Sequence, residues 1–285
     1  MSRALLAAAL LVGTTGCPDN LEKQSRVSKL RVLAVRAEPP ELVLESGKPL
    51  PSTVLTALAV EPSGSAIALR FALCTALGDA PSPVLPCPGS AGLDLPDAGP
   101  SAARLSLDDP RIVAFAAGFD GGFGDAGPAL AAGVPLLVGF TASATGADGG
   151  FEALDGFDTV KLRSGAPSGA NPELRAVQLA EELDGGTLGD AQDLGPGTVA
   201  RAGAAYHLIP ITGAKDDPAR RYGFSFFATG GAISSLRSTD ITGSGGAANT
   251  WVEWTAPAEP GVVRFWVVLR DGRGTAWLER AATVR

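Results

Sequence analysis

Short segments with strand character, separated by glycine, proline and aspartate, make up most of this sequence. In residues 67–73 every second residue is Ile, Leu or Phe, a period of two that predicts a strand with one buried face. Comparable segments occur at 30–37, 53–60, 111–117, 136–142, 159–163, 205–211, 222–229, 251–255, 262–269 and 276–284. Long helical patterns are missing, which counts against a parallel α/β sheet. The pattern is typical of an all-β sandwich or barrel, and we expect antiparallel β-sandwiches.

The segment 164–170 (SGAPSGA) has the composition of a linker and divides these strands into two groups. We expect a first β-sandwich domain at 29–163 and a second at 171–285. Residues 75–103 of the first domain are rich in proline and glycine, and we expect an irregular loop there. Residues 172–183 allow two interpretations, because Asn171-Pro172 is typical of a helix start. We expect a strand across 175–179, since the rest of the chain has β character.

The N-terminus has the layout of an export signal. Arg3 is followed by nine apolar residues (4–12), too few to span a bilayer, and then by Gly-Thr-Thr-Gly-Cys ending at Cys17. This arrangement resembles a bacterial lipobox, so we expect 1–16 to be cleaved and Cys17 to be acylated. Thr14 stands where the lipobox usually has Leu; the alternative is a plain secretory signal that leaves Cys17 free. Residues 17–28 are polar and predict a short tether.

This layout predicts a location in the cell envelope and a first partner, the lipid bilayer, held through acylated Cys17. The sequence does not distinguish the outer membrane from the periplasmic face of the inner membrane. The chain carries 23 basic and 30 acidic residues, for a net charge of −7. An acidic chain lacks the basic face that nucleic-acid binding needs, so we expect no nucleic-acid partner.

The remaining two cysteines, Cys74 and Cys87, are separated by twelve residues. In an oxidising compartment an even pair usually forms a disulfide, and we expect one here. Two free thiols or half of a metal site are the alternatives. The spacing lacks the CxxC pattern and the nearby histidine of a zinc site.

Three passages carry a family resemblance: KLRVLAVRAEPPEL (29–42) with TVLTALAV (53–60), FFATGG (226–231), and WTAPAEPGVVRFWVVLRDGRGTAWLE (254–279). Together they resemble uncharacterised lipoproteins common in myxobacteria, which have immunoglobulin-like or PKD-like repeats. The resemblance implies two immunoglobulin-like sandwiches used for spacing or recognition, and it implies no catalytic residues. The first domain lacks the WTAP and DGRG passages, so the motifs do not establish two equivalent repeats.

Aromatic residues give the second domain its candidate ligand-binding side chains. All four tryptophans, Trp251, Trp254, Trp266 and Trp277, lie in the last 35 residues. Exposed, they could stack on sugars or anchor a protein partner. Buried, they are core residues, and this is the interpretation we favour. Trp266 faces away from the apolar face of 263–269, so one face of that strand is exposed unless the sheet is covered on both sides.

Catalytic and metal-binding patterns are weak. His207, the single histidine, lies in a strand and no GxSxG motif accompanies it, so we expect no catalytic residues. Clusters of Asp and Gly at 119–127, 147–158 and 183–193 supply carboxylates on turns, with Asp120, Asp125 and Asp148 as weak calcium candidates. Asp125 comes one residue too early for a calcium β-roll. We expect ordinary turns and no metal or other cofactor.

These observations predict a non-enzymatic, lipid-anchored envelope protein that works as an interaction or scaffold module for an envelope protein. The alternative is a calcium-assisted glycan-binding protein or a secreted hydrolase that uses the Asp/Gly loops and the tryptophans.

Overall fold

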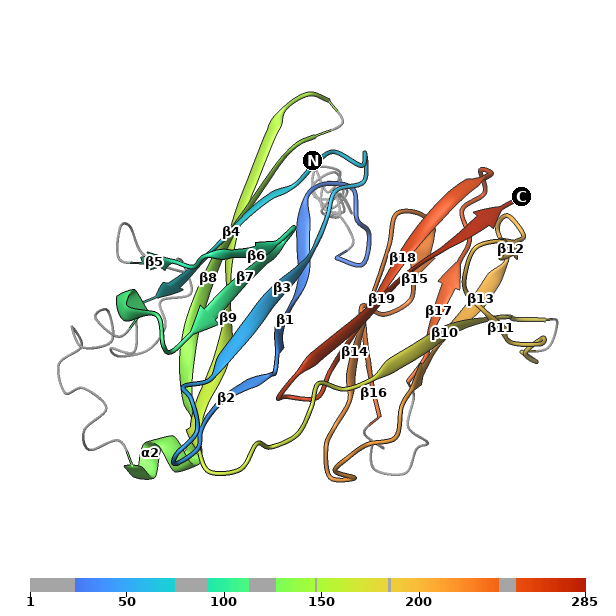
Figure 1. Ribbon diagram of the computed structural model, residues 1–285. Coiled ribbons are helices and arrows are strands. Elements are labelled where there is room, and N and C mark those ends of the chain that lie inside the picture. The colour runs from blue at the N-terminus through green and yellow to red at the C-terminus, as the bar shows by residue number, and fades with distance from the viewer. Residues whose placement is uncertain (1–23, 75–91, 113–126, 147, 184–185, 241–249) are drawn as a thin grey trace, which may run out of the picture.

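The computed structural model describes residues 24–74, 92–112, 127–146, 148–183, 186–240 and 250–285. The described chain forms two β-sandwiches that lie side by side (Figure 1). The strands of the first are β1 (Arg31–Glu38), β2 (Glu41–Leu44), β3 (Ser52–Val60), β4 (Ala68–Cys74), β5 (Gly92–Asp94), β6 (Asp97–Gly99), β7 (Ala102–Ser106), β8 (Val134–Thr145) and β9 (Phe151–Ser164), with the short helix α2 (Gly127–Ala132) before β8.

The first sandwich consists of a four-stranded sheet, β1-β3-β7-β6, and a five-stranded sheet, β2-β9-β8-β4-β5. Its core lies between the two sheets, because alternate residues of the paired strands point inward. Leu55, Leu105 and Val138 are among the most buried members of this core. The predicted alternation of residues 67–73 places Phe71 and Leu73 in the same cluster.

The second sandwich contains β10 (Leu174–Glu181), β11 (Gln192–Asp193), β12 (Val199–Ala200), β13 (Ala205–Thr212), β14 (Gly223–Ala228), β15 (Ala232–Ile233), β16 (Arg237–Thr239), β17 (Val252–Thr255), β18 (Gly261–Arg270) and β19 (Thr275–Val284). One sheet has the order β11-β10-β13-β17-β15 and the other β12-β19-β18-β14-β16. Trp254 lies at the centre of the core, completely buried, with its ring edge-on to Phe265 at 4.8 Å and tilted against Tyr206 at 5.7 Å.

Both sandwiches have the strand order of immunoglobulin domains. In the first domain, the order β1-β3-β7-β6 corresponds to the ABED sheet of an immunoglobulin domain, and β4-β8-β9 corresponds to its CFG sheet. In the second domain, β10-β13-β17-β15 and β14-β18-β19 correspond to the same two sheets. In each, a short strand, β2 or β12, pairs parallel to the last strand. The predicted all-β, immunoglobulin-like fold is confirmed. The shared strand order also makes the two domains equivalent in topology, which the motifs did not establish.

A third apolar cluster joins the two sandwiches. Trp266 and Val268, on the outer face of β18, are buried against Leu33, Ala34, Leu58 and Val60 on the outer face of β1 and β3. Trp277 packs at the edge of this cluster, and the Arg36 guanidinium lies over its ring at 4.9 Å. The strand β18 is therefore covered on both faces, one by its own core and one by the first domain.

The predicted tether is docked at its C-terminal end. The backbone of Ala228 donates to the Ser25 carbonyl at 2.9 Å and accepts from the Val27 amide at 2.8 Å. Val27 and Leu30 are buried, 1% and 4% exposed. The C-terminal end of the expected tether at 17–28 therefore contacts the second domain, because residues 25–27 form a short parallel segment beside β14.

One correction concerns the predicted strand at 111–117. Residues 110–112 form a helical turn, and the remainder of that segment lies outside the described residues. The Asp109 carboxylate accepts a hydrogen bond from the Arg111 amide at 2.9 Å, and Pro110 occupies the first helical position. This is a typical helix start, which the apolar composition of the segment concealed. At 172–183 the predicted strand is confirmed as β10.

Candidate binding surface and domain junction

The outer face of the sheet β11-β10-β13-β17-β15 points away from the first domain. His207, near the start of β13, faces outward because its neighbours Tyr206 and Leu208 point into the core. Its cross-strand neighbours on this face are Ala180 on β10 and Glu253 on β17. Because the Ala180 side chain is small, residues next to the strand ends, Glu182 after β10 and Trp251 before β17, can reach the imidazole.

Trp251, immediately before β17, covers the imidazole of His207. The two rings are stacked, 3.9 Å between centroids and 16° between planes, so His207 is only 8% exposed while Trp251 remains 37% exposed. The Glu182 carboxylate lies 3.5 Å from His207 Nε2. His207 Nδ1 is buried and has no hydrogen-bond partner.

This arrangement can recognise a ligand but has few features of a catalytic centre. The stack on His207 covers one face of the Trp251 indole and holds the ring in place. Two carboxylates, Glu182 and Glu253, lie on either side of His207 across the sheet. An aromatic face of this kind can pack against apolar or cationic groups, and the carboxylates can accept hydrogen bonds. Within the described ranges, no cluster of three or more His, Cys, Asp or Glu side chains could hold a metal ion.

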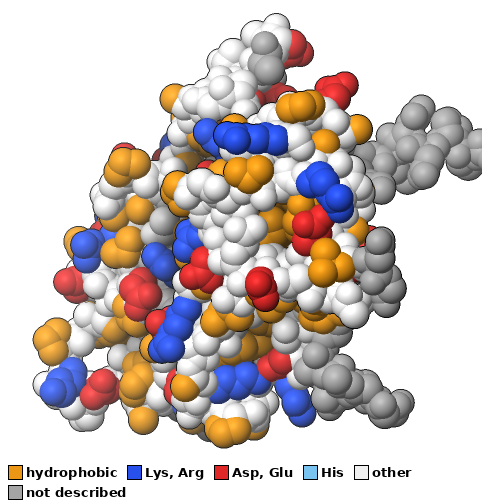
Figure 2. Space-filling model, turned by 90° about the vertical axis from the view of Figure 1, so that its right-hand side faces the viewer, with side chains coloured by type: hydrophobic (Ala, Val, Ile, Leu, Met, Phe, Trp, Pro, Cys, Tyr) orange, Lys and Arg blue, Asp and Glu red, His pale blue; other side chains and the backbone are white. Residues whose placement is uncertain are grey.

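Acidic, basic and apolar side chains are interspersed on the side of the molecule that the second domain presents (Figure 2). Such mixed polarity does not distinguish an interface from the rest of a protein surface, so the candidate centre is identified by its aromatic residue. Among the large hydrophobic residues of the described chain that are exposed, Trp251 is the one held by a ring stack.

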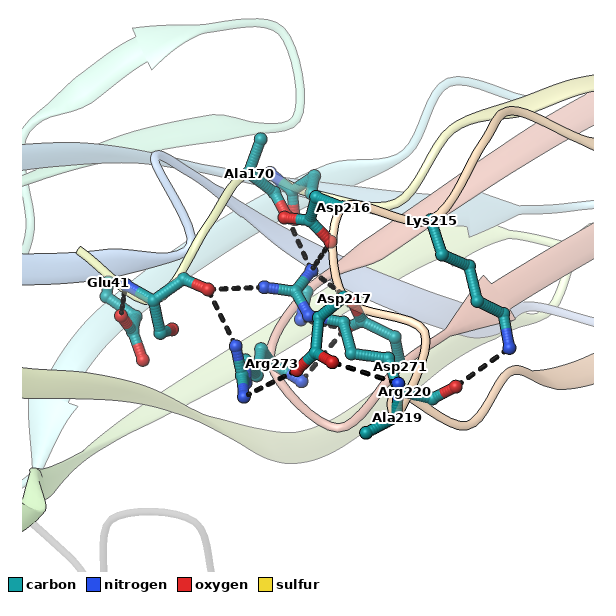
Figure 3. A network of polar contacts seen from close by, with 12 residues as sticks. Glu41, Ala170, Lys215, Asp216, Asp217, Ala219, Arg220, Asp271 and Arg273 are labelled. Atoms are coloured by element: carbon teal, nitrogen blue, oxygen red, sulfur yellow. Dashed lines mark hydrogen bonds and ion pairs between the residues drawn. The ribbon is translucent and has the colours of Figure 1, made fainter.

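A buried polar network fixes the junction between the domains (Figure 3). The Arg220 side chain is 3% exposed and its Nη1 donates to Asp271 Oδ2 at 2.8 Å, while the Asp271 side chain is fully buried. Arg220 Nη2 also donates to the Ser168 carbonyl at 2.6 Å. Asp271 in turn accepts from the Arg273 and Gly274 amides at 2.9 and 2.7 Å. A buried charge needs this degree of hydrogen bonding to be tolerated.

The predicted linker is held from both sides. On the first domain, the Glu41 carboxylate accepts from the Ser168 amide at 3.0 Å. On the second, Arg273 Nη1 donates to the Ser168 carbonyl at 2.6 Å. Asn171 bridges the domains, because its Nδ2 donates to the Ala37 carbonyl at 2.7 Å and its Oδ1 accepts from the Thr275 amide at 3.0 Å. The two sandwiches are therefore joined by an anchored segment.

Gly274 is required for this close approach. A Cβ at position 274 would lie 2.3 Å from Asn171 Oδ1 and 3.1 Å from its Cα. The glycine of the DGRG passage therefore has a packing role at the junction in addition to its role in the turn between β18 and β19.

Glu41 makes the junction sensitive to acid. Burial raises the pKa of its carboxyl, but the hydrogen bonds from Ser168 and the charges of Arg163 and Lys161 outweigh this, and the pKa lies below the ordinary 4.5. A carboxyl with a lowered folded-state pKa stabilises the fold above its unfolded-state pKa and loses that contribution as the pH falls through the folded-state value.

We therefore expect the free energy of unfolding to fall between about pH 5 and pH 3, and to fall less steeply in Glu41→Gln. Urea denaturation at a series of pH values measures this slope. Glu45→Gln, at an exposed position after β2, is the matched control and should reproduce the original slope. If the free energy of unfolding changed equally with pH in Glu41→Gln and in the unaltered protein, this role for Glu41 would be contradicted.

The structure separates the four tryptophans instead of bringing them together. Trp254 is 0% exposed in the core of the second sandwich, as the core interpretation expects, whereas Trp266 is 2% exposed in the domain junction and lies outside that core. Trp277 lies under Arg36 at the junction edge. The ligand-binding interpretation stays a prediction for Trp251.

The remaining candidates depend on turns and termini. Asp148 lies between β8 and β9, where its Oδ1 accepts from the Gly150 amide at 2.9 Å, the geometry of an ordinary aspartate turn. Cys74 is buried at the end of β4. Cys17, Cys87, Asp120 and Asp125 lie outside the described residues, so the acylation, the disulfide and these calcium ligands stay predictions.

Sequence reasoning missed Glu182, Glu253, Arg220 and Asp271. The first two are identified only through the register of β13 with β10 and β17. Asp271 belongs to the DGRG passage, but its partner Arg220 is 51 residues away in the sequence. The one local signal was an arginine pair, 220–221, next to two aspartates.

No family model matches the chain, and no curated protein matches it. Solved structures similar to it include the D0-D1 domain of intimin, with 12% identity over 88% of this chain and 98% of that one and a TM-score of 0.24. A Bacteroides ovatus mixed-linkage glucan utilization locus protein, SGBP-B, in complex with a mixed-linkage heptasaccharide has 11% identity over 90% and 47% and a TM-score of 0.22. A chimeric titin Z1Z2 tandem has 11% identity over 90% and 97% and a TM-score of 0.21. Since these TM-scores are low, the fold is assigned from the strand order alone.

Proposed function

We propose that this protein is a non-enzymatic module, anchored in the cell envelope by acylated Cys17, that binds an envelope protein through the outer face of β10, β13 and β17. The observation that carries the proposal is the exposed indole of Trp251, held by its stack on His207 at 3.9 Å. Rigid, partly exposed tryptophans are over-represented among the residues that dominate protein interfaces.

The anchored junction supports a scaffold role. Arg220 and Asn171 fix the segment between the domains, and the Trp266 cluster covers the faces that meet. A module built in this way holds the Trp251 surface in a constant orientation relative to residues 25–27 and therefore to the tether. No helix in the described part of the chain is both long and apolar enough to cross a bilayer.

A glycan ligand is the second candidate, favoured by the carboxylates beside the ring. Glu182 and Glu253 can accept hydrogen bonds from sugar hydroxyls while the indole packs against the ring C–H groups. His207 Nδ1, buried and unpartnered, offers one more polar contact if a ligand reaches it.

The test is affinity capture from a detergent extract of the envelope with the mature protein, compared with Trp251→Ala. We expect the captured protein to decrease at least about tenfold in the variant, the effect of losing a hot-spot residue. Phe157→Ala is the matched control, since Phe157 is an aromatic residue 48% exposed on the first domain, and it should capture as the unaltered protein does. Equal capture by all three proteins would contradict the proposed surface.

Two further measurements separate the remaining alternatives. Titration with soluble envelope polysaccharide, followed by tryptophan fluorescence, supports the glycan candidate if Trp251→Ala abolishes the response. Mass spectrometry of the mature N-terminus tests the anchor; an unmodified Cys17 would contradict it.

A further inference from the structure

Exposed apolar side chains gather at one end of the molecule. Of the eight large hydrophobic residues of the described chain that are exposed, five lie at the strand ends closest to residues 25–30: Phe151, Leu183, Leu188, Val199 and Val262. Phe151 and Val262 are the two most exposed, 78% and 66%. Isolated exposed hydrophobics are common, but a concentration at one end indicates a contact surface.

The strand register places these residues at a common end. In the first domain, Phe151 begins β9, and the neighbouring Glu152 carboxylate accepts from the Leu30 amide at 2.7 Å. In the second, Val262 lies at the start of β18, near the end of β14 where Ala228 pairs with residues 25–27. Because the segment 25–30 contacts both places, the two domains present these ends on the same side.

The other three residues extend this surface across the second domain. Val199 on β12 pairs with Thr283, which also pairs with Val262, so the two valines flank one residue of β19. Leu183 and Leu188 follow the end of β10, where the Glu182 amide donates to the Ala205 carbonyl at 2.9 Å. Figure 1 shows the β8–β9 hairpin rising above the first sandwich, and β12 and the C-terminus at the same side of the second.

The length of the chain before Gln24 limits how far this end can be from the membrane. The Gln24 carbonyl accepts from Arg31 Nη1 at 2.6 Å, which fixes the start of the described chain beside the start of β1. Cys17 precedes Gln24 by seven residues, and seven residues span at most about 25 Å when fully extended. Acyl chains on Cys17 would therefore hold this end close to the lipid headgroups.

We propose that this end of the molecule lies on the bilayer surface, with Phe151 at the hairpin tip and Val262 entering the headgroup region. The inference rests on the proposed lipid anchor at Cys17. Charged side chains of both signs, among them Lys29, Glu152 and Arg264, lie near this end, so the contact depends on apolar burial and does not require anionic lipid. The Trp251 surface then faces sideways, parallel to the membrane, where a neighbouring envelope protein can reach it.

The experiment uses the mature acylated protein in vesicles of phosphatidylethanolamine and phosphatidylglycerol that contain doxyl-labelled lipids. Single variants Phe151→Cys and Val262→Cys carry an environment-sensitive fluorophore. Leu50→Cys is the matched control, since Leu50 is 50% exposed at the opposite strand ends, just before β3. We expect quenching at positions 151 and 262 to exceed quenching at position 50 at least twofold.

Flotation of the same samples distinguishes the failure of this inference from the failure of the anchor. Protein that floats with the vesicles but shows equal quenching at the three positions, or the most quenching at 50, would overturn the bilayer contact and leave the anchor intact. Protein that does not float would overturn both. A fluorophore response at 151 and 262 that increases with protein concentration in the absence of vesicles would indicate a second copy of the chain in place of the membrane, and would also overturn the proposal.

Discussion

Replacing Arg220 by alanine should lower the free energy of unfolding by about 3–5 kcal/mol, the effect of removing one partner from a buried ion pair. The Asp271 carboxylate would stay fully buried without its cation, and the Ser168 carbonyl would lose the donor that anchors the segment between the domains. Equilibrium urea unfolding followed by far-ultraviolet circular dichroism measures the change.

The chain offers a matched control for this variant. Arg201 forms an ion pair of 2.6 Å with Glu181, but its side chain is 72% exposed. Exposed pairs of this kind contribute about 0–1 kcal/mol, so Arg201→Ala should unfold almost as the unaltered protein does. If Arg220→Ala lost no more stability than Arg201→Ala, the buried network would not be a determinant of the junction.

Local patterns predicted most of the fold. Alternation in 67–73 and in 262–269 identified strands and their buried faces, because a strand with one face in a core must repeat every second residue. The same period places Phe226 and Phe227 on opposite faces of β14, Phe226 in the core and Phe227 against the junction cluster. The apolar composition of 111–117 predicts a strand, but Asp109 and Pro110 begin a helical turn at 110–112.

Contacts between distant segments could not be predicted in the same way. Periodicity indicated that Trp266 faces away from the core of its own sheet, but which surface covers it depends on how the two domains pack. The same holds for His207, whose neighbours Glu182 and Trp251 come from two other parts of the sheet. A single sequence contains the side chains of such a site but not the register that brings them together.

Docking of the tether illustrates the same limit. Residues 17–28 are polar as a group, and this composition predicts a tether without indicating where it contacts the domains. Val27 is one of few apolar residues in it, and it is buried because it packs into the apolar cluster that contains Trp266. The burial of Val27 and the two backbone hydrogen bonds to Ala228 hold residues 25–27 beside β14.

Trp266→Ala should weaken the coupling between the domains. Trp266 is 2% exposed and is the largest side chain in the cluster that joins the two sandwiches, so its truncation leaves a cavity at the interface. Large-to-small substitutions of buried aromatic residues cost about 3–5 kcal/mol. Because this loss falls on contacts between domains, we expect thermal unfolding to change from one cooperative transition to two.

Trp254→Ala provides the comparison that makes this result specific. Trp254 is also buried, but inside the core of the second sandwich alone, so its truncation should leave the junction contacts in place and lower the temperature of a single, shared transition. Differential scanning calorimetry of both variants separates the two effects. If the junction couples the folding of the domains, Trp266→Ala should show two transitions. Trp254→Ala should show one, because its junction is intact. One unchanged transition in Trp266→Ala would mean that the polar network around Arg220 couples them without the apolar cluster.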